Sequence, residues 1–154
     1  MIRLAQAKFP ADESAVRELF LEYAASLPFS LRFQNWEHEL ANLAEGYGPP
    51  EGSLILAFEE DAPAGCVALR RYGESVCEMK RLYLRSGYRG QKLGKRLAQA
   101  IVAEARKLKY QRMVLDTVPQ MSEAIALYRD LGFREIPPYR FNPVPGALYF
   151  EITL

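Results

Sequence analysis

The sequence contains few of the residues that build metal centres and histidine-based catalytic sites. Among 154 residues there is one histidine, His38, and there are two cysteines, Cys66 and Cys77. A single imidazole argues against a histidine-based triad and against a multi-histidine metal site, and the cysteines form no CxxC pair. We therefore expect no metal, no disulfide framework and no cysteine that carries an acyl group covalently.

Long apolar runs and an excess of one charge are also missing. The first ten residues, MIRLAQAKFP, hold no apolar core of signal-peptide length, and no stretch approaches the roughly 18 residues of a membrane span. The 20 Lys and Arg residues nearly balance 19 Asp and Glu residues, which leaves a formal net charge of +1. The balanced charge therefore favours neither nucleic acid nor membranes as a partner. The missing signal and membrane segments predict a cytoplasmic protein. The length of 154 residues predicts a single domain, residues 1–154.

Hydrophobic periodicity predicts alternating strands and helices. Strands are expected at 2–7, 53–58, 65–71, 76–84, 112–118, 133–136 and 147–153, and helices at 12–27, 35–47, 90–108 and 122–131. Short polar turns join the strands at 53–58, 65–71 and 76–84, which is typical of an antiparallel meander. The order βααβββαβαββ indicates an α/β (α+β) fold with a mixed, mostly antiparallel sheet and helices on both faces.

One segment separates its charges sharply. From Met79 to Ala103 there is no acidic residue, but there are seven basic ones: Lys80, Arg81, Arg85, Arg89, Lys92, Lys95 and Arg96. Four of them crowd the start of the helix predicted at 90–108, where they oppose the positive end of the helix dipole. A bound anion would explain this arrangement, because free N–H groups at a helix N-terminus reached through glycines form a phosphate site. The alternative is a solvated basic face.

The segment Arg89-Gly90-Gln91-Lys92-Leu93-Gly94 follows a predicted strand and opens a predicted helix. It resembles the pyrophosphate-binding signature of the GNAT superfamily of acyl-CoA-dependent N-acetyltransferases, Gln/Arg-x-x-Gly-x-Gly/Ala. Arg89 and Gly94 match the outer positions, while Lys92 replaces the usual glycine. The resemblance extends from about Ala64 to Phe133, through EMKRLYL before the loop and AIALYRDLGF after it. It implies an enzyme that transfers an acetyl group from acetyl-CoA to a primary amine, of unidentified nature, by direct attack in a ternary complex.

The same resemblance implies a coenzyme site along the strand at 76–84 and the loop after it. The pantetheine arm would pair with backbone groups of Leu82, Tyr83 and Leu84. Main-chain N–H groups of the loop would hold the pyrophosphate; the residues concerned are Arg89, Gly90, Gln91, Lys92, Leu93, Gly94 and Lys95. In this family the strands corresponding to 76–84 and 112–118 splay apart, which would leave the thioester near Thr117 and Val118.

Tyr128, in AIALYRDLGF, stands where the family commonly places a phenol near the coenzyme sulfur. The resemblance implies that it donates a proton to the departing thiolate, whereas the helical pattern alone favours packing in the core. An asparagine often precedes this helix in the family, but Met121 occupies the position here. The corresponding polar contact is then missing or comes from Gln120 or Ser122.

Direct transfer needs a neutral amine, so a group near the acceptor must remove a proton from the ammonium. Glu78 is the first candidate, since many relatives carry a carboxylate facing the acceptor at this strand position. The alternative for Glu78 is an ion pair with Lys80, Arg70 or Arg71, and Asp116 and Glu37 are weaker candidates for the base. Acceptor specificity is expected from two aromatic loops, through Phe29, Phe33, Tyr139 and Asn142, although these side chains could equally cap the core.

The expected partners are therefore acetyl-CoA and an amine acceptor, with a homodimer left open and with neither nucleic acid nor membrane. Two alternatives stay open at this stage. One is a catalytically silent GNAT-like domain that binds acyl-CoA, which the Met121 departure would allow. The other is a nucleic-acid-binding module that uses the basic segment 80–96 and binds in a salt-sensitive manner.

Overall fold

The computed structural model describes residues 1–154, apart from the side chain of Phe33. Seven strands form one sheet: β1 (Ile2–Gln6), β2 (Ser53–Glu59), β3 (Ala62–Gly73), β4 (Val76–Leu84), β5 (Arg112–Thr117), β6 (Arg134–Ile136) and β7 (Leu148–Thr153). Their spatial order is β1-β2-β3-β4-β5-β7-β6. Only β4 and β5 run parallel, and every other neighbouring pair is antiparallel. The predicted mixed, mostly antiparallel sheet is confirmed.

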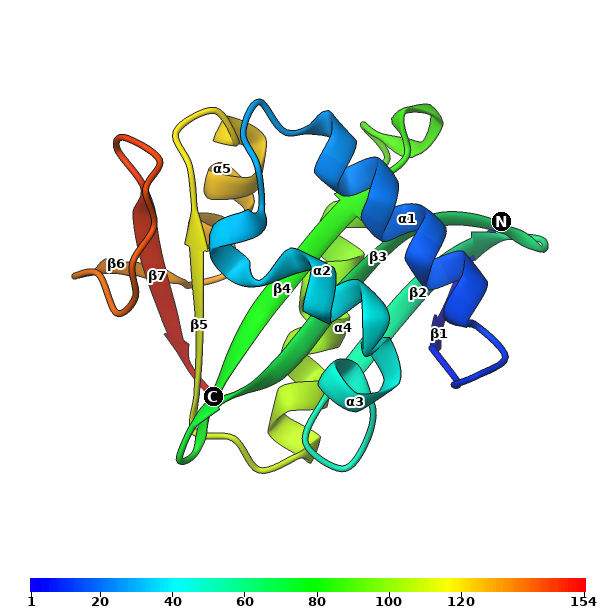
Figure 1. The fold of residues 1–154 in the computed structure, drawn as a ribbon, viewed down its shortest axis with the longest axis horizontal. Coiled ribbons are helices and arrows are strands. Elements are labelled where there is room, and N and C mark those ends of the chain that lie inside the picture. The colour runs from blue at the N-terminus through cyan, green and yellow to red at the C-terminus, as the bar shows by residue number, and fades with distance from the viewer.

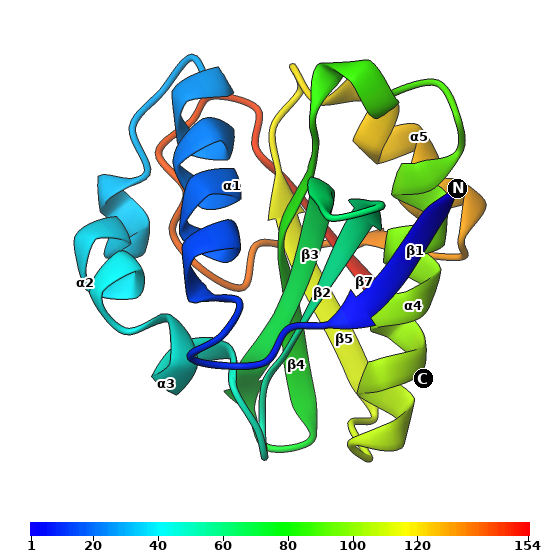
Figure 2. The same ribbon diagram turned by 90° about the vertical axis from the view of Figure 1, so that its right-hand side faces the viewer.

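Helices cover both faces of the sheet, as predicted (Figure 2). One face carries α1 (Glu13–Ser26), α2 (Trp36–Ala41) and α3 (Leu43–Tyr47), and the other carries α4 (Leu93–Lys107) and α5 (Ser122–Asp130). Two short 3-10 turns, η1 (Arg32–Gln34) and η2 (Ser86–Tyr88), precede α2 and α4. None of these helices, within the described part of the chain, is long and apolar enough to span a membrane.

The predicted order contained one helix at 35–47, whereas the structure has two. The division lies at Asn42, where the backbone leaves the helical region with φ −134° and ψ 46°. The amide nitrogen of the Asn42 side chain donates a hydrogen bond of 2.9 Å to the carbonyl of His38, one turn earlier. A short polar side chain that binds the backbone in this way competes with the helix, which explains the break.

Each face of the sheet has its own apolar core. On the α4 face, Leu93, Leu97 and Ile101 recur at helical spacing and are almost fully buried. On the opposite face, Leu19 and Phe20 of α1 pack in a second buried cluster with residues of α3 and the inner strands. These apolar stripes hold the helices against the sheet, because burying them removes apolar surface from water.

Strand β4 contains a bulge at Arg81. Lys80 pairs with Ala68 of β3 and Tyr83 pairs with Cys66, so β4 has one residue more than β3 between these two pairs. Arg81 adopts a left-handed backbone conformation with φ +62°, which is uncommon for a residue with a side chain. A bulge of this kind bends the strand and changes where its side chains point.

Strands β4 and β5 pair over only part of their length. The parallel register joins Val76–Glu78 to Arg112–Val114 and ends there. Beyond this point β4 continues along β3 as far as Leu84, and β5 continues along β7 as far as Thr117. Figure 1 shows the two ribbons together at one end and separated at the other. The edge of β4 that faces β5 is therefore left without a strand partner beyond Glu78.

We predict that Leu97→Ala lowers the free energy of unfolding by about 2–5 kcal/mol, because it leaves a cavity under α4 where Leu97 is fully buried. Urea unfolding followed by circular dichroism measures the change. Gln99→Ala, at an exposed position of the same helix, is the control and should change stability by no more than about 0.5 kcal/mol. Equal losses in both variants would contradict the assigned buried face.

Candidate active site

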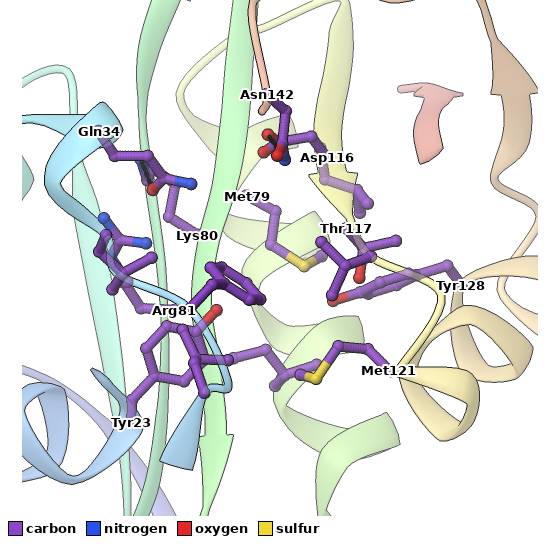
Figure 3. Close-up of a pocket in the computed structure, with 16 residues that line it drawn as sticks. Tyr23, Gln34, Met79, Lys80, Arg81, Asp116, Thr117, Met121, Tyr128 and Asn142 are labelled. Atoms are coloured by element: carbon purple, nitrogen blue, oxygen red, sulfur yellow. Dashed lines mark hydrogen bonds between the residues drawn. The ribbon is translucent and has the colours of Figure 1, made fainter. Parts of the chain in front are cut away.

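A cavity of about 50 Å³ lies where β4 and β5 separate. Its walls come from β4, from the end of β5, from α1 and the segment after it, from α5, and from the loops before α5 and β7. The lining residues are Tyr23, Leu27, Phe29, Leu31, Gln34, Met79, Lys80, Arg81, Leu82, Leu115, Asp116, Thr117, Val118, Met121, Tyr128 and Asn142. Figure 3 shows Lys80 and Gln34 on one side of this cavity and Asp116, Thr117 and Tyr128 on the other.

Tyr128 reaches the cavity from α5 and also packs in the core. Its ring lies 5.7 Å from that of Phe133 and 6.3 Å from that of Phe150 between centroids, and its hydroxyl end is directed into the cavity near Thr117 (Figure 3). Burial raises the pKa of Tyr128 above its ordinary value, and the charge of Asp116 adds to this rise. The phenol is therefore protonated at neutral pH and is available as a proton donor.

Two cations line the cavity, Lys80 and Arg81, and Lys80 is only 6% exposed. Its Nζ donates a hydrogen bond of 2.9 Å to Oε1 of Gln34. Burial, reinforced by the neighbouring charge of Arg81, lowers the pKa of Lys80 to about 7. Sequence reasoning named Lys80 as part of a basic segment and as a possible ion-pair partner of Glu78, but not as a residue of the acceptor site. Its position two residues beyond Glu78 on the same strand was the available signal that it faces the same side.

Asp116 supplies the carboxylate of the cavity wall. Nδ2 of Asn142 donates a hydrogen bond of 3.0 Å to Oδ2 of Asp116, while Oδ1 of Asn142 accepts one of 3.0 Å from the backbone of Val144. Asn142 thus links the loop before β7 to the end of β5. Of the predicted acceptor residues, Asn142 and Phe29 both line the cavity.

Glu78 does not line the cavity, although its side chain is completely buried. Its carboxylate accepts hydrogen bonds from the Tyr139 hydroxyl at 2.7 Å, from Arg140 at 2.8 Å and from Arg70 at 3.4 Å. Burial by itself would raise the pKa of Glu78, but the charges of Lys80 and Arg140 and the Tyr139 hydrogen bond hold it below its ordinary value. The ion pair with Arg70, which the sequence left open, is present. These donors favour the ionised carboxylate and make it a weak base.

Tyr139 also lies outside the lining of the cavity. Its ring packs edge-on against those of Tyr72 and Tyr149, at centroid distances of 5.0 and 5.5 Å. Phe29, in contrast, borders both the cavity and a wider groove of about 520 Å³ that is lined by Pro28, Phe29, Ser30, Arg32, Gln120, Pro143, Val144 and Pro145. The side chain of Phe33 lies outside the part of the chain that the structure describes. Gln120 faces the groove, whereas Met121 faces the cavity.

The basic loop leads into α4 with its backbone exposed. The first hydrogen bond of the helix runs from the Arg96 N–H to the Lys92 carbonyl, so the N–H groups of Leu93, Gly94 and Lys95 have no carbonyl one turn earlier in the helix. Gly90 and Lys92 both have positive φ, at +82° and +60°, which turns the chain into the helix. The α4 N-terminus adjoins β4 and α5, because a Cβ on Gly94 would lie 3.5 Å from Leu84 and 3.7 Å from Leu127.

The seven cations of this segment do not form one surface. Lys80 and Arg81 are buried, and Arg81 is bound by Glu39 at 2.6 and 2.8 Å. Arg85 is bound by Glu18 and Glu22 of α1. The alternative of a solvated basic face therefore does not hold for the whole segment, because Lys80, Arg81 and Arg85 are buried or bound by carboxylates. Four cations remain around the helix start, namely Arg89, Lys92, Lys95 and Arg96, and one of these, Lys95, pairs with Asp130 at 2.8 Å.

Comparison with known proteins identifies the family. The model of the acetyltransferase (GNAT) family matches residues 14–133. The chain belongs to this family. An uncharacterized N-acetyltransferase of Schizosaccharomyces pombe is 40% identical over 155 residues, covering 99% of this chain and 95% of the relative. An N-acetylaspartate synthetase of Xenopus tropicalis is 30% identical over 113 residues. The aligned region covers 72% of this chain and 42% of that relative.

The fold is also that of solved GNAT proteins. The PaiA N-acetyltransferase of Thermoplasma acidophilum, solved in complex with coenzyme A, superposes with a TM-score of 0.76 over 100% of this chain and 99% of that one, at 18% identity. The predicted membership of the GNAT superfamily and the prediction of an N-acetyltransferase enzyme are confirmed. Within the described residues of this GNAT protein, no group of three or more His, Cys, Asp or Glu side chains is arranged to hold a metal ion.

We predict that Glu78→Gln lowers the free energy of unfolding by about 3–5 kcal/mol at neutral pH, because Arg70 and Arg140 lose their buried counter-charge. The folded-state pKa of Glu78 is lowered, so its stabilisation is present above the unfolded-state pKa and is lost as pH falls through the folded-state value. The difference from the parent in urea unfolding should therefore shrink on acidification. Unchanged stability together with a shifted pH profile of kcat/KM would instead support Glu78 as the base.

Proposed function

We propose that this GNAT protein transfers an acetyl group from acetyl-CoA to a primary amine by direct attack within a ternary complex. The observation that carries the proposal is the separation of β4 from β5 between the open N-terminus of α4 and the hydroxyl of Tyr128. This gap offers an unpaired strand edge, an anion site and a proton donor in one continuous region. In coenzyme-dependent acyl transfer, the coenzyme supplies an activated acyl group as a thioester.

The residues present fit a coenzyme of this shape. We place the pantetheine arm against the unpaired edge of β4 at Leu82, Tyr83 and Leu84, where it would add to the sheet as a further strand does. The pyrophosphate would accept hydrogen bonds from the loop 89–95, whose helix N–H groups and nearby cations favour an anion. The acetyl end would then lie beside Thr117, in the cavity that contains Tyr128.

Two side chains of the cavity fit the proton transfers that the reaction needs. Tyr128 is protonated and buried, so we assign it the donation of a proton to the departing thiolate. For the base we propose Asp116 in place of Glu78, because Asp116 lines the cavity whereas Glu78 lies outside it and is held by three donors. Asn142 would hold the Asp116 carboxylate in position through its hydrogen bond.

A panel of amines tests the proposal directly. Each amine is incubated with acetyl-CoA, release of the free thiol is followed, and the acetylated product is identified by mass spectrometry. The panel should include polyamines, peptides, protein lysines and amino acids, the last because one relative is named N-acetylaspartate synthetase. Thiol release that depends on one class of amine supports the proposal, whereas binding of acetyl-CoA without turnover across the panel would favour a silent binding domain.

We predict that Gly94→Glu weakens binding of CoA at least about tenfold, because the new carboxylate lies at the α4 N-terminus where we place the pyrophosphate. The fold should persist, since Gly94 has ordinary φ and a Cβ there makes only normal contacts. Isothermal titration calorimetry with CoA measures the effect. Gly94→Gln has the same bulk without the charge and serves as the matched control. A Gly94→Glu protein that binds CoA as the parent does would refute this phosphate site.

We predict that Tyr128→Phe leaves acetyl-CoA affinity unchanged but slows acetyl transfer by about a hundredfold. The ring still packs while its proton is lost, and a thiolate is already a fair leaving group, so the low end of general-acid effects applies. Single-turnover rates at saturating acceptor measure chemistry without interference from product release. Tyr110→Phe, whose hydroxyl bonds to the Glu51 carbonyl far from the cavity, is the control. An unchanged rate would return Tyr128 to a purely structural role.

A further inference from the structure

The charge of Lys80 is the least compensated one in the cavity. Its only hydrogen-bond partner among the described residues is Oε1 of Gln34, which is neutral. Arg81, its neighbour on the strand, already has both guanidinium contacts with Glu39. A lysine that is only 6% exposed and whose ammonium contacts a neutral partner is unusual, because buried charges are normally paired.

The surroundings leave an excess of positive charge. The charged side chains that act on Lys80 are Arg70 of β3, Glu78 and Arg81 of β4 and Glu39 of α2. Asp116 of β5 lines the same cavity, and Arg140 of the loop before β7 binds Glu78. Glu39 is used by Arg81, and Glu78 is shared by Arg70 and Arg140. No carboxylate in the described structure is within salt-bridge distance of Lys80.

The opposite wall carries a negative charge. Asp116 faces the same cavity from β5 and accepts one hydrogen bond, from neutral Asn142 (Figure 3). The cavity therefore has a cation on the β4 side and an anion on the β5 side. A small molecule with a positive end and a negative end would meet an opposite charge on both walls.

We propose that the acceptor amine also carries a carboxylate, which binds to the Lys80 ammonium and the Gln34 amide while the amine faces Asp116. This inference rests on the proposed acetyl transfer, and it names the acceptor as an amino acid or a related amino carboxylate. Gln34 fits the role because its Oε1 accepts from Lys80 and its amide N–H groups can donate to the carboxylate. The same arrangement turns the amine toward Thr117 and Tyr128.

A bound carboxylate also changes the titration of Lys80. Burial and the charge of Arg81 lower the pKa of Lys80 to about 7, and a carboxylate beside the ammonium raises it again. Carboxylate binding is therefore strongest below the pKa of free Lys80 and weakens as pH rises above it, because the ammonium loses its proton. Selectivity for a carboxylate-bearing acceptor falls with increasing pH.

The kinetic test uses acceptors matched in length, each with and without its one carboxylate: glycine with glycinamide, β-alanine with β-alaninamide, and γ-aminobutyrate with γ-aminobutyramide. The ratio of kcat/KM within a pair should favour the carboxylate by about ten- to hundredfold, as expected for a hydrogen bond to a charged group. The ratio should fall between about pH 6 and about pH 9, through the pKa range of Lys80. In Lys80→Met the ratio should approach one and become independent of pH.

Three variants separate this role from others. Met matches the length of Lys without its charge, so Lys80→Met should fold, and Lys80→Arg should retain part of the preference. Lys107→Met, at an exposed position near the end of α4, should keep the parent ratio. If Lys80→Met slows both members of a pair equally, Lys80 acts on the amine itself, and the carboxylate site is refuted.

A binding measurement makes the inference independent of turnover. The pKa of Lys80 is measured by an NMR pH titration of the CoA-saturated protein, with either propionate or propionamide present. The Lys80 signal is assigned as the one that is missing from the spectrum of Lys80→Met. Propionate should raise the pKa of Lys80, and propionamide should leave it unchanged. The same pKa of Lys80 with both probes would overturn the carboxylate site, even if the protein acetylates amines. A shift with propionate in a protein that acetylates no amine would support the site while the proposed function fails.

Discussion

The buried ion pair between Arg81 and Glu39 is the constraint on which the active-site region depends. Arg81 occupies the bulge of β4 in a left-handed conformation, and its guanidinium is held by two short hydrogen bonds to a carboxylate of α2. Burial opposes ionisation of Glu39, but Arg81 holds its pKa below the ordinary value. Neither partner can be removed alone without leaving an unpaired buried charge. The pair therefore fixes both the bulge and the position of α2 over the sheet.

The bulge connects this pair to the cavity. It lies just beyond the last residues of β4 that pair with β5, and the cavity opens at the same level. A regular strand would continue the parallel ladder toward Thr117 and would close the gap. The bend instead leaves an edge of β4 free, and the same bend carries Lys80 and Arg81 onto the cavity wall. One local irregularity thus supplies both the space for a ligand and the charge that lines it.

Sequence periodicity predicted the framework well because its signals are local. The strand at 76–84 matches β4 at both ends, and the apolar spacing from Leu93 onward predicted α4 to within a few residues. Periodicity could not predict contacts between segments that are distant in the sequence. Tyr139 and Arg140 follow Glu78 by about sixty positions and bind its carboxylate, so the first candidate for the base is held in a buried ion pair, the alternative that the sequence had left open. Asn142 and Gln34 were likewise brought to Asp116 and Lys80 only by the fold.

The proposed coenzyme and acceptor halves of the site differ in how they are built, and this explains why the sequence pattern pointed to the first and not to the second. The predicted coenzyme half uses backbone groups of one continuous segment, β4 through the start of α4, so its pattern survives in a linear sequence. The acceptor half combines single side chains from η1, β4, β5 and the loop before β7. Charges on facing walls select a molecule by the distance between its own charged groups as well as by their sign. On the proposed function, acceptor choice would be set by a few side chains on separate elements, which can change while the coenzyme half stays the same.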